Sequence, residues 1–493
     1  MCSALAQGTA PSKGNSYSIF TRQEIQLDGR LRHLTLERLG PSPAKSIVAV
    51  ERSGSYPEWK VSLTLWSAEA STGKIKKDGA VSLPPDAVFY GFARPTGAER
   101  SSLILVRKES VEAWKPTGGA FETDPRFQDR AASFFSTSPK GEVIPYEPAI
   151  EGLKNEGSLI AAPTAGGLSV YSLGGDGLKK IATYPAPLHG FYQSGLDSLP
   201  FDLSFWVRGS IWYPKNVLGR FSHAEADDLL WPWMDEVTAA PFEKEGKGGE
   251  SRTIQFHQLS EEERDDGKSY VVITPVDLNH DGRTDFLVNK FRGTATSLRG
   301  ETTMFFTRAD GTVPENGEQL KAKGNRASGA LPVDLNKDGL ADLVVASTQY
   351  NAWAVVRALI RRLAVVDFSF YIQHPDGFHL AEPDLSHEIS FQFDLDEGEV
   401  SGLLPTLDGD FNGDGYPDAV FAKNRSAVTV LLQKPGQRDF FPLSGVRSFE
   451  VPVPRLMHVG DVDGDGLSDV VLFDTRAAGN RKVTVLMNNG ILK

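Results

Sequence analysis

The residues of this chain best suited to chemistry are the acidic side chains of four nine-residue segments in its second half. Each segment has Asp or Asn at positions 1, 3, 5 and 9 and Gly at position 6. Alternate side chains of such a segment can turn toward one point, and Gly permits the sharp turn that this requires. We therefore predict four sites that bind a hard cation through oxygen. The side-chain ligands expected are Asp277, Asn279, Asp281 and Asp285; Asp334, Asn336, Asp338 and Asp342; Asp410, Asn412, Asp414 and Asp418; and Asp461, Asp463, Asp465 and Asp469.

The ligand types favour Ca²⁺ over other metals. Zn²⁺ would recruit nitrogen or sulfur, and Mg²⁺ prefers a stricter octahedron and keeps its water. The alternative is that these segments are only polar Asn/Asp/Gly turns. The recurrence of the same spacing in four copies argues against it. The backbone carbonyl at position 7 can complete each set, and the residues concerned are Arg283, Leu340, Tyr416 and Leu467.

The segments are not EF-hand loops, because an EF-hand needs a bidentate Glu at position 12. That position holds Val288, Val345, Phe421 and Leu472. A short apolar run rich in β-branched residues follows position 9 in each copy, and this predicts a buried β-strand rather than a helix.

A second strand is expected after each of these strands, so the repeating unit is a β-hairpin behind a metal loop. The second strands are Met304–Phe306, Phe368–Ile372, Val428–Leu432 and Val483–Met487. The same hairpin without ligands is expected four times upstream, at Ile47–Val50 with Val61–Trp66, Leu103–Val106 with Val111–Trp114, Leu159–Ala162 with Leu168–Tyr171, and Phe205–Val207 with Ile211–Tyr213.

Strand-rich units recurring about every fifty residues predict the blades of a β-propeller. Two longer intervals contain insertions. One is a charged tract, Glu261–Asp266, and the other is Ala352–Leu363, whose apolar residues at i, i+3 and i+4 predict a surface helix.

The metal loops, the apolar strands and endings such as VTVLLQKPG and VTVLMNNG resemble the FG-GAP/VCBS repeat family, which includes the calcium-binding propellers of integrin alpha-subunits. The resemblance covers residues 270–493 well and the first half weakly. It implies an all-β fold of four-stranded antiparallel blades in which the metal loop joins the first and second strands. The chain then ends after a third strand, and Tyr17–Leu27 is expected to supply the fourth and close the ring. We expect eight blades, with seven as the alternative.

Composition agrees with one such domain over residues 17–493. The four loops contain 13 of the 64 acidic residues, so the net charge of −12 is largely assigned to the metal sites. The sequence has no basic stripe of the kind that binds nucleic acid, so no nucleic-acid partner is expected. It also has no apolar run long enough to predict a membrane span. Residues 1–16 are expected to be a truncated signal peptide, with an ordinary flexible terminus or a lipidated Cys2 as alternatives.

Catalytic motifs give no positive signal, and His374 and His379 are expected in a hairpin turn. Several aromatic residues lie close together in the sequence, of which Trp231 and Trp233 are the candidates for contacting a ligand. The expected function is that of a secreted, periplasmic or surface-exposed bacterial scaffold, monomeric and non-catalytic, that binds a protein or a glycan. The alternative, implied by similar calcium-loaded propellers among rhamnogalacturonan lyases, is a polysaccharide lyase or hydrolase.

Overall fold

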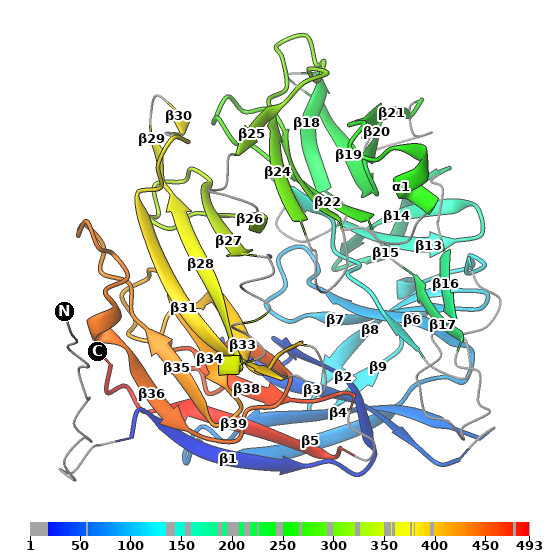
Figure 1. The fold of residues 1–493 in the computed structure, drawn as a ribbon. Helices are drawn as coiled ribbons and strands as arrows, with labels where there is room; N and C mark the ends of the chain where they lie inside the picture. The colour runs from blue at the N-terminus through cyan, green and yellow to red at the C-terminus, as the bar shows by residue number, and fades with distance from the viewer. Residues whose placement is uncertain are drawn as a thin grey trace, which may run out of the picture.

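The fold was analysed in a computed structural model, and the strands form a ring of blades around a central axis (Figure 1). The structure describes residues 18–55, 58–134, 143–152, 159–185, 190–194, 207–211, 217–223, 226–242, 250–265, 269–292, 299–320, 326–349, 356, 360–374, 377–378, 380–394, 399–476 and 480–492. Within these ranges, no helix has the length and apolar character needed to cross a membrane.

Eight antiparallel blades, numbered here along the chain, make up the ring. Blades 1 to 4 contain β2 (Arg30–Glu37), β3 (Ser46–Ser53), β4 (Lys60–Ala68) and β5 (Ile75–Ser82); β6 (Ala87–Ala93), β7 (Ser102–Arg107), β8 (Val111–Thr117) and β10 (Gln128–Asp129); β13 (Leu159–Thr164), β14 (Gly167–Gly174) and β15 (Gly177–Tyr184); and β18 (Val217–His223), β19 (Ala226–Trp233), β20 (Glu236–Pro241) and β21 (Arg252–Gln255).

The blades of the second half carry the predicted metal loops between their first and second strands. Blades 5 to 8 contain β22 (Ser269–Val276), β23 (Asp285–Arg292), β24 (Arg299–Phe305) and β25 (Glu318–Leu320); β26 (Arg326–Val333), β27 (Asp342–Gln349), β28 (Leu363–Tyr371) and β31 (Leu385–Asp394); β33 (Leu403–Gly409), β34 (Asp418–Asn424), β35 (Ala427–Leu431) and β36 (Arg447–Glu450); and β37 (Leu456–Gly460), β38 (Asp469–Phe473), β39 (Lys482–Asn488) and β1 (Phe20–Gln26).

Short elements decorate this ring. They are β9 (Ala120–Glu122) beside β8, β11 (Ile144–Pro145) parallel to β6, β12 (Glu151–Gly152) parallel to β18, β32 (Glu399–Val400) beside β31, the pair β16 (Gly190–Ser194) and β17 (Val207–Ile211), the pair β29 (Gln373–His374) and β30 (Gly377–Phe378), the helix α1 (Glu261–Asp265), and the 3₁₀ turns Pro125–Phe127 and Leu443–Gly445. Blade 3 gains an inner edge from Ala149, which bridges to Ile160 of β13.

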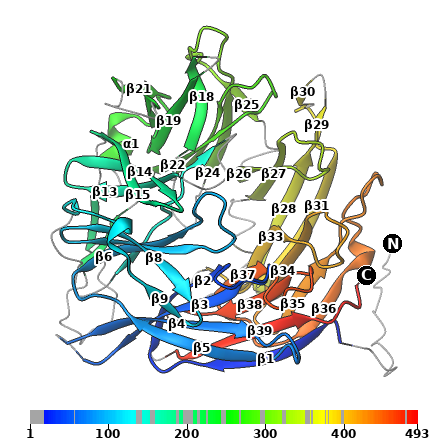
Figure 2. The same ribbon diagram turned by 180° about the vertical axis from the view of Figure 1, so that it is seen from behind.

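The first and last strands of the chain pair with each other, as predicted. β1 runs antiparallel to β39, with Phe20 opposite Asn488 and Gln26 opposite Lys482. The two strands lie side by side in both views (Figures 1 and 2). This pairing completes blade 8 and closes the ring.

The core is divided among the interfaces between blades. Eight clusters of buried apolar residues are described, and each draws its members from two neighbouring blades, including blades 8 and 1. A ring of eight blades has eight interfaces, so the described clusters account for all of them. Eight blades are therefore confirmed and the alternative of seven is wrong.

The position of the fourth upstream hairpin was predicted wrongly. Of the predicted strands, only Val207 and Ile211 are described, and they are the two ends of β17, which pairs with β16 in a separate two-stranded sheet; residues 205, 206, 212 and 213 lie outside the described residues. The second and third strands of blade 4 are instead β19 and β20. The aromatic-rich sequence of residues 205–213 is typical of a core strand, which led to the wrong prediction. The true strand β19 was overlooked because it contains Asp227, Asp228 and Pro232, which are unusual in a strand.

Two other predictions concern insertions. Helix α1 occupies the charged tract at residues 261–265. Most of the expected helix at residues 352–363 lies outside the described residues, although Val356, Ile360 and Arg361 are helical and Leu363 already begins β28. His374 lies in the β29–β30 hairpin, while residue 379 and the terminal residues 1–16 lie outside the described residues.

Candidate metal centres in the loops of blades 5 to 8

The four acidic loops connect the first and second strands of consecutive blades, at residues 277–285, 334–342, 410–418 and 461–469. Position 6 has positive φ in every loop, from 82° at Gly282 to 86° at Gly466, which explains the Gly there. Position 4 is also left-handed, at φ 57° for His280, 61° for Lys337, 78° for Gly413 and 84° for Gly464. Sequence reasoning missed this second constraint, although the two glycines at position 4 indicate it.

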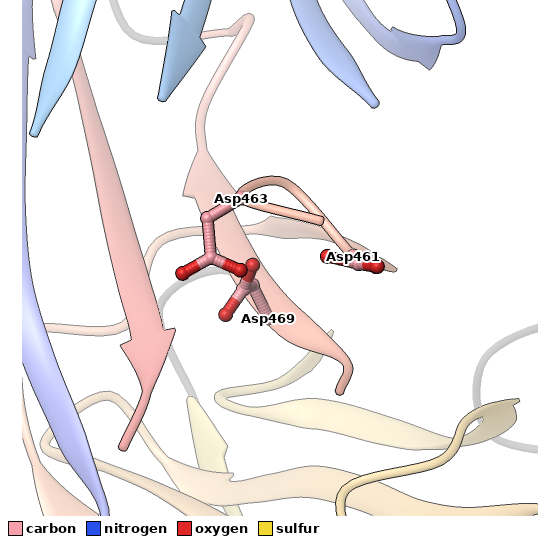
Figure 3. A group of neighbouring side chains, drawn as sticks. All are labelled: Asp461, Asp463 and Asp469. Carbon is pink, nitrogen blue, oxygen red and sulfur yellow. The ribbon is translucent and has the colours of Figure 1, made fainter. Parts of the chain in front are cut away.

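The loop of blade 8 brings three carboxylates together. One carboxylate oxygen from each of Asp461, Asp463 and Asp469 lies within 4.8 Å of the others. Figure 3 shows the carboxyl groups of Asp463 and Asp469 facing one another, with Asp461 beside them. Three oxygen donors this close suit a hard divalent cation, which would offset their mutual repulsion.

The first aspartate of each loop accepts backbone hydrogen bonds from within the loop. Asp277 Oδ2 accepts the amide of Gly282 at 3.0 Å, and Asp461 Oδ2 accepts that of Gly466 at 3.1 Å. The other oxygens of Asp277 and Asp334 are buried and have no hydrogen-bond partner among the described residues. A buried carboxylate oxygen without a partner is costly, so these two atoms are suited to be ligands of a cation.

The last aspartate of each loop has a different arrangement, because it is buried at the start of the second strand. In blade 5, Asp285 Oδ2 accepts the amide of Leu278 at 3.0 Å and Oδ1 accepts that of Thr307 at 2.8 Å. The other three loops repeat this pattern. The pairs of donors are Leu335 and Gln373 for Asp342, Phe411 and Gln433 for Asp418, and Val462 and Asn488 for Asp469, all at 2.7 to 2.8 Å.

Burial raises the pKa of Asp285 and Asp469 to about 7 and that of Asp342 and Asp418 to about 6. Hydrogen bonds from the backbone amides oppose the rise, and the neighbouring loop carboxylates add to it. Ionising these buried carboxyl groups therefore costs free energy, and a bound cation would reduce that cost.

Blade 4 contains the same buried aspartate without the rest of the ligand set. Asp228 is 1 % exposed, and its Oδ2 accepts the amide of Phe221, seven residues earlier, at 3.1 Å. The separation of seven residues is the same as between Asp285 and Leu278. Sequence reasoning missed Asp228, although its place directly before the apolar run LLW is the signal seen in the metal loops.

Neighbouring blades are joined at these loops. The side chain of Asn488 donates from Nδ2 to the carbonyl of Phe411 at 2.9 Å, and that of Gln433 donates from Nε2 to the carbonyl of Leu335 at 2.9 Å. Each of these two residues also donates its backbone amide to the last aspartate of its own blade's loop. Blades 6, 7 and 8 are thus linked by buried hydrogen bonds that run from the end of a third strand to the loop of the preceding blade.

The two aromatic residues expected to contact a ligand are not on the surface. Trp231 is 3 % exposed and Trp233 is 9 % exposed, and both belong to β19. Trp231 packs in the cluster between blades 3 and 4, with its ring centroid 6.1 Å from that of Tyr184. The expected placement of these residues in an insertion was wrong, because both lie in a core strand.

Comparison with solved structures finds other proteins at low similarity. The WD40 domain of SCAP from fission yeast is 10 % identical with a TM-score of 0.38, covering 96 % of this chain and 98 % of that one. A protein from Lactobacillus plantarum is 13 % identical with a TM-score of 0.34, covering 79 % and 90 %. An Agrocybe aegerita lectin described as recognising non-reducing terminal N-acetylglucosamine is 13 % identical with a TM-score of 0.35, covering 66 % and 78 %. At these scores the similarity carries no argument about function.

Comparison with curated proteins gave no match. The model of the FG-GAP-like repeat matches residues 277–345 and 410–472. The first match contains the loops of blades 5 and 6, and the second contains those of blades 7 and 8. The chain is therefore an eight-bladed β-propeller that carries FG-GAP-like repeats in these two segments.

Proposed function

We propose that this protein is a calcium-stabilised, non-catalytic propeller that acts outside the cytoplasm as a scaffold for binding a protein or a glycan. Each loop of blades 5 to 8 would hold one Ca²⁺ through the side chains at positions 1, 3 and 5, with the position-7 carbonyl and the aspartate at position 9. Bound calcium would supply the positive charge that lets these carboxylates lie close together in their ionised form.

The observation that carries this proposal is the unpartnered, buried carboxylate oxygen of Asp277 and of Asp334. The other oxygen of each of these carboxylates accepts a backbone amide of its own loop, so the unpartnered oxygen is the atom available to a cation. The three converging carboxylates of blade 8 support the same conclusion independently.

The experiment is a calcium titration of the EDTA-treated protein, followed by calorimetry and by thermal unfolding. We expect about four bound ions and a melting temperature that rises with calcium, because calcium would bind the folded state preferentially. The variant Asp461→Asn should bind one ion fewer and retain the remaining sites.

The matched control is Asp228→Asn, which alters a buried aspartate with the same backbone contact in a blade without the ligand set. It should lower the melting temperature and leave the number of bound ions unchanged. The same melting curve with calcium and with EDTA, or the same ion count in Asp461→Asn as in the unaltered protein, would contradict the proposal.

A further inference from the structure

The interface between blades 6 and 7 contains a cavity of about 390 Å³. Its walls come from both blades, and the inner strands β26 and β33 contribute Leu331 and Leu404. Protein interiors are packed with few voids larger than a water molecule, so a space of this size between two blades is unusual. Its volume falls in the range of sites that bind small molecules.

The walls of this cavity are apolar. Blade 6 provides Phe368, Phe370 and Ile389, and blade 7 provides Phe421 and Leu431. These side chains belong to the buried cluster between the two blades, so their positions are fixed by packing on their other sides. An apolar cavity does not hold well-ordered water, because water needs two to four polar partners. The interior therefore favours a hydrocarbon occupant.

The edge of the cavity differs from its walls. Leu331 is 64 % exposed and Leu404 is 53 % exposed, so two large apolar side chains from facing blades are left in contact with solvent. Thr406 and Asp408, also in the lining, provide polar groups and hydrogen-bond to each other. His387 completes the polar part of the lining, and its Nε2 lies 3.3 Å from Asp439 Oδ1, within ion-pair distance.

We infer that this cavity is a binding site for a small apolar molecule of one or two rings that carries a single polar end group. The hydrocarbon part would replace solvent against the phenylalanine and leucine side chains, which is the favourable term. The polar end would lie toward Thr406, Asp408 and His387, where a hydroxyl can both donate and accept a hydrogen bond. The cavity adjoins the acidic loops of blades 6 and 7, since Val333 directly precedes Asp334 and Ala419 directly follows Asp418, and the test therefore keeps calcium present.

The test uses 2-naphthol as the probe and the full chain in calcium-containing buffer, with binding followed by calorimetry and by the fluorescence of the probe. We expect saturable binding of one molecule per chain and a rise in melting temperature on saturation. The variant Ala346→Phe places a ring inside the cavity, since Ala346 lines it, and should weaken binding at least tenfold.

Two further variants keep the test valid if Ala346→Phe fails to fold. Leu404→Trp changes an exposed residue at the edge of the cavity and should also weaken binding at least tenfold by covering the entrance. Leu456→Trp is the control, because Leu456 is an exposed leucine, 39 % accessible, on the inner strand of blade 8 and outside this cavity. Absence of saturable binding, or equal binding by Leu404→Trp and Leu456→Trp, would overturn the inference.

Discussion

At the scale of single residues, the aspartates of the loops divide into two kinds. Those at position 9 use both oxygens to accept backbone amides, one from the loop and one from the end of the third strand. Asp228 accepts the equivalent loop amide in a blade that has no other ligands, so this contact stabilises the blade with or without metal. The sequence pattern predicted the aspartates as ligands and did not distinguish this structural role, because both roles require the same carboxylate.

His33 gives a residue-scale prediction for pH dependence. Burial lowers the pKa of His33 to about 4 and also lowers the pKa of His458, so both rings are neutral in the folded protein at neutral pH. The groups facing them are the hydroxyl of Tyr90, 2.6 Å from His33 Nδ1, and the carbonyl of Leu34, 2.9 Å from His458 Nε2, with Lys45 and Asp408 near His458. A histidine whose folded pKa is depressed contributes stability above its unfolded pKa of about 6.5, and this stability is lost as the pH falls toward 4.

We therefore expect the free energy of unfolding at pH 5 to be about 2 kcal/mol lower than at pH 7 through His33 alone. Urea unfolding of the calcium-saturated protein at the two pH values would measure this. The variant His33→Gln cannot titrate and should show a correspondingly smaller difference. Equal pH dependence in the two proteins would mean that the pKa of His33 is the same in the folded and unfolded states.

At the scale of elements, blades 7 and 8 are each held to the preceding blade at the end of the third strand. Asn488 is the last residue of β39 and is 6 % exposed, and Gln433 lies two residues beyond β35 and is 2 % exposed. Their backbone amides bind the loop aspartate of their own blade, and their side chains reach the loop of the preceding blade. These polar residues sit beyond the apolar runs that marked the strands, so hydrophobic patterning alone did not identify them.

Asn488→Leu tests this connection. It leaves the buried carbonyl of Phe411 without its donor, and an unsatisfied buried acceptor costs about 1–3 kcal/mol. We expect a fall of about 2 kcal/mol in the free energy of unfolding, measured by urea titration with calcium present. The exposed neighbour Asn489 is the matched control, and Asn489→Ala should cost less than about 0.5 kcal/mol. Similar losses in both variants would show that the side chain of Asn488 does not join the blades.

At the scale of the whole molecule, the sequence predicted the eight-bladed architecture correctly but did not place the strands of blade 4 correctly. The acidic loops could be recognised from the strict spacing of their Asp, Asn and Gly residues. The strand around Phe20 was predicted because the last blade would otherwise have lacked a fourth strand. Blade 4 was misplaced because β18, with the sequence VLGRFSH, has a weak apolar pattern and an aromatic-rich segment precedes it. The cavity between blades 6 and 7 could not be predicted from the sequence, because it depends on how the side chains of two blades pack against each other in three dimensions.

Ring closure gives the last prediction. Phe20 of β1 packs edge-on to Phe411 of blade 7, at a ring-centroid distance of 6.1 Å, while Ile25 of the same strand packs in the cluster between blades 8 and 1. One strand from the start of the chain therefore seals interfaces on both of its faces. Phe20→Ala should lower the free energy of unfolding by about 3–5 kcal/mol, the usual cost of deleting a buried ring.

Thr21→Ala, on the exposed residue beside it, should cost less than about 0.5 kcal/mol. A closed ring has no free edge at which unfolding can begin, so the protein should still unfold in one step. With calcium present, Phe20→Ala should also lower the denaturant concentration at the midpoint of unfolding. If the variant instead unfolded in two steps, with calcium affecting only the second, blades 5 to 8 would form an independent unit and the pairing of β1 with β39 would not couple the two halves.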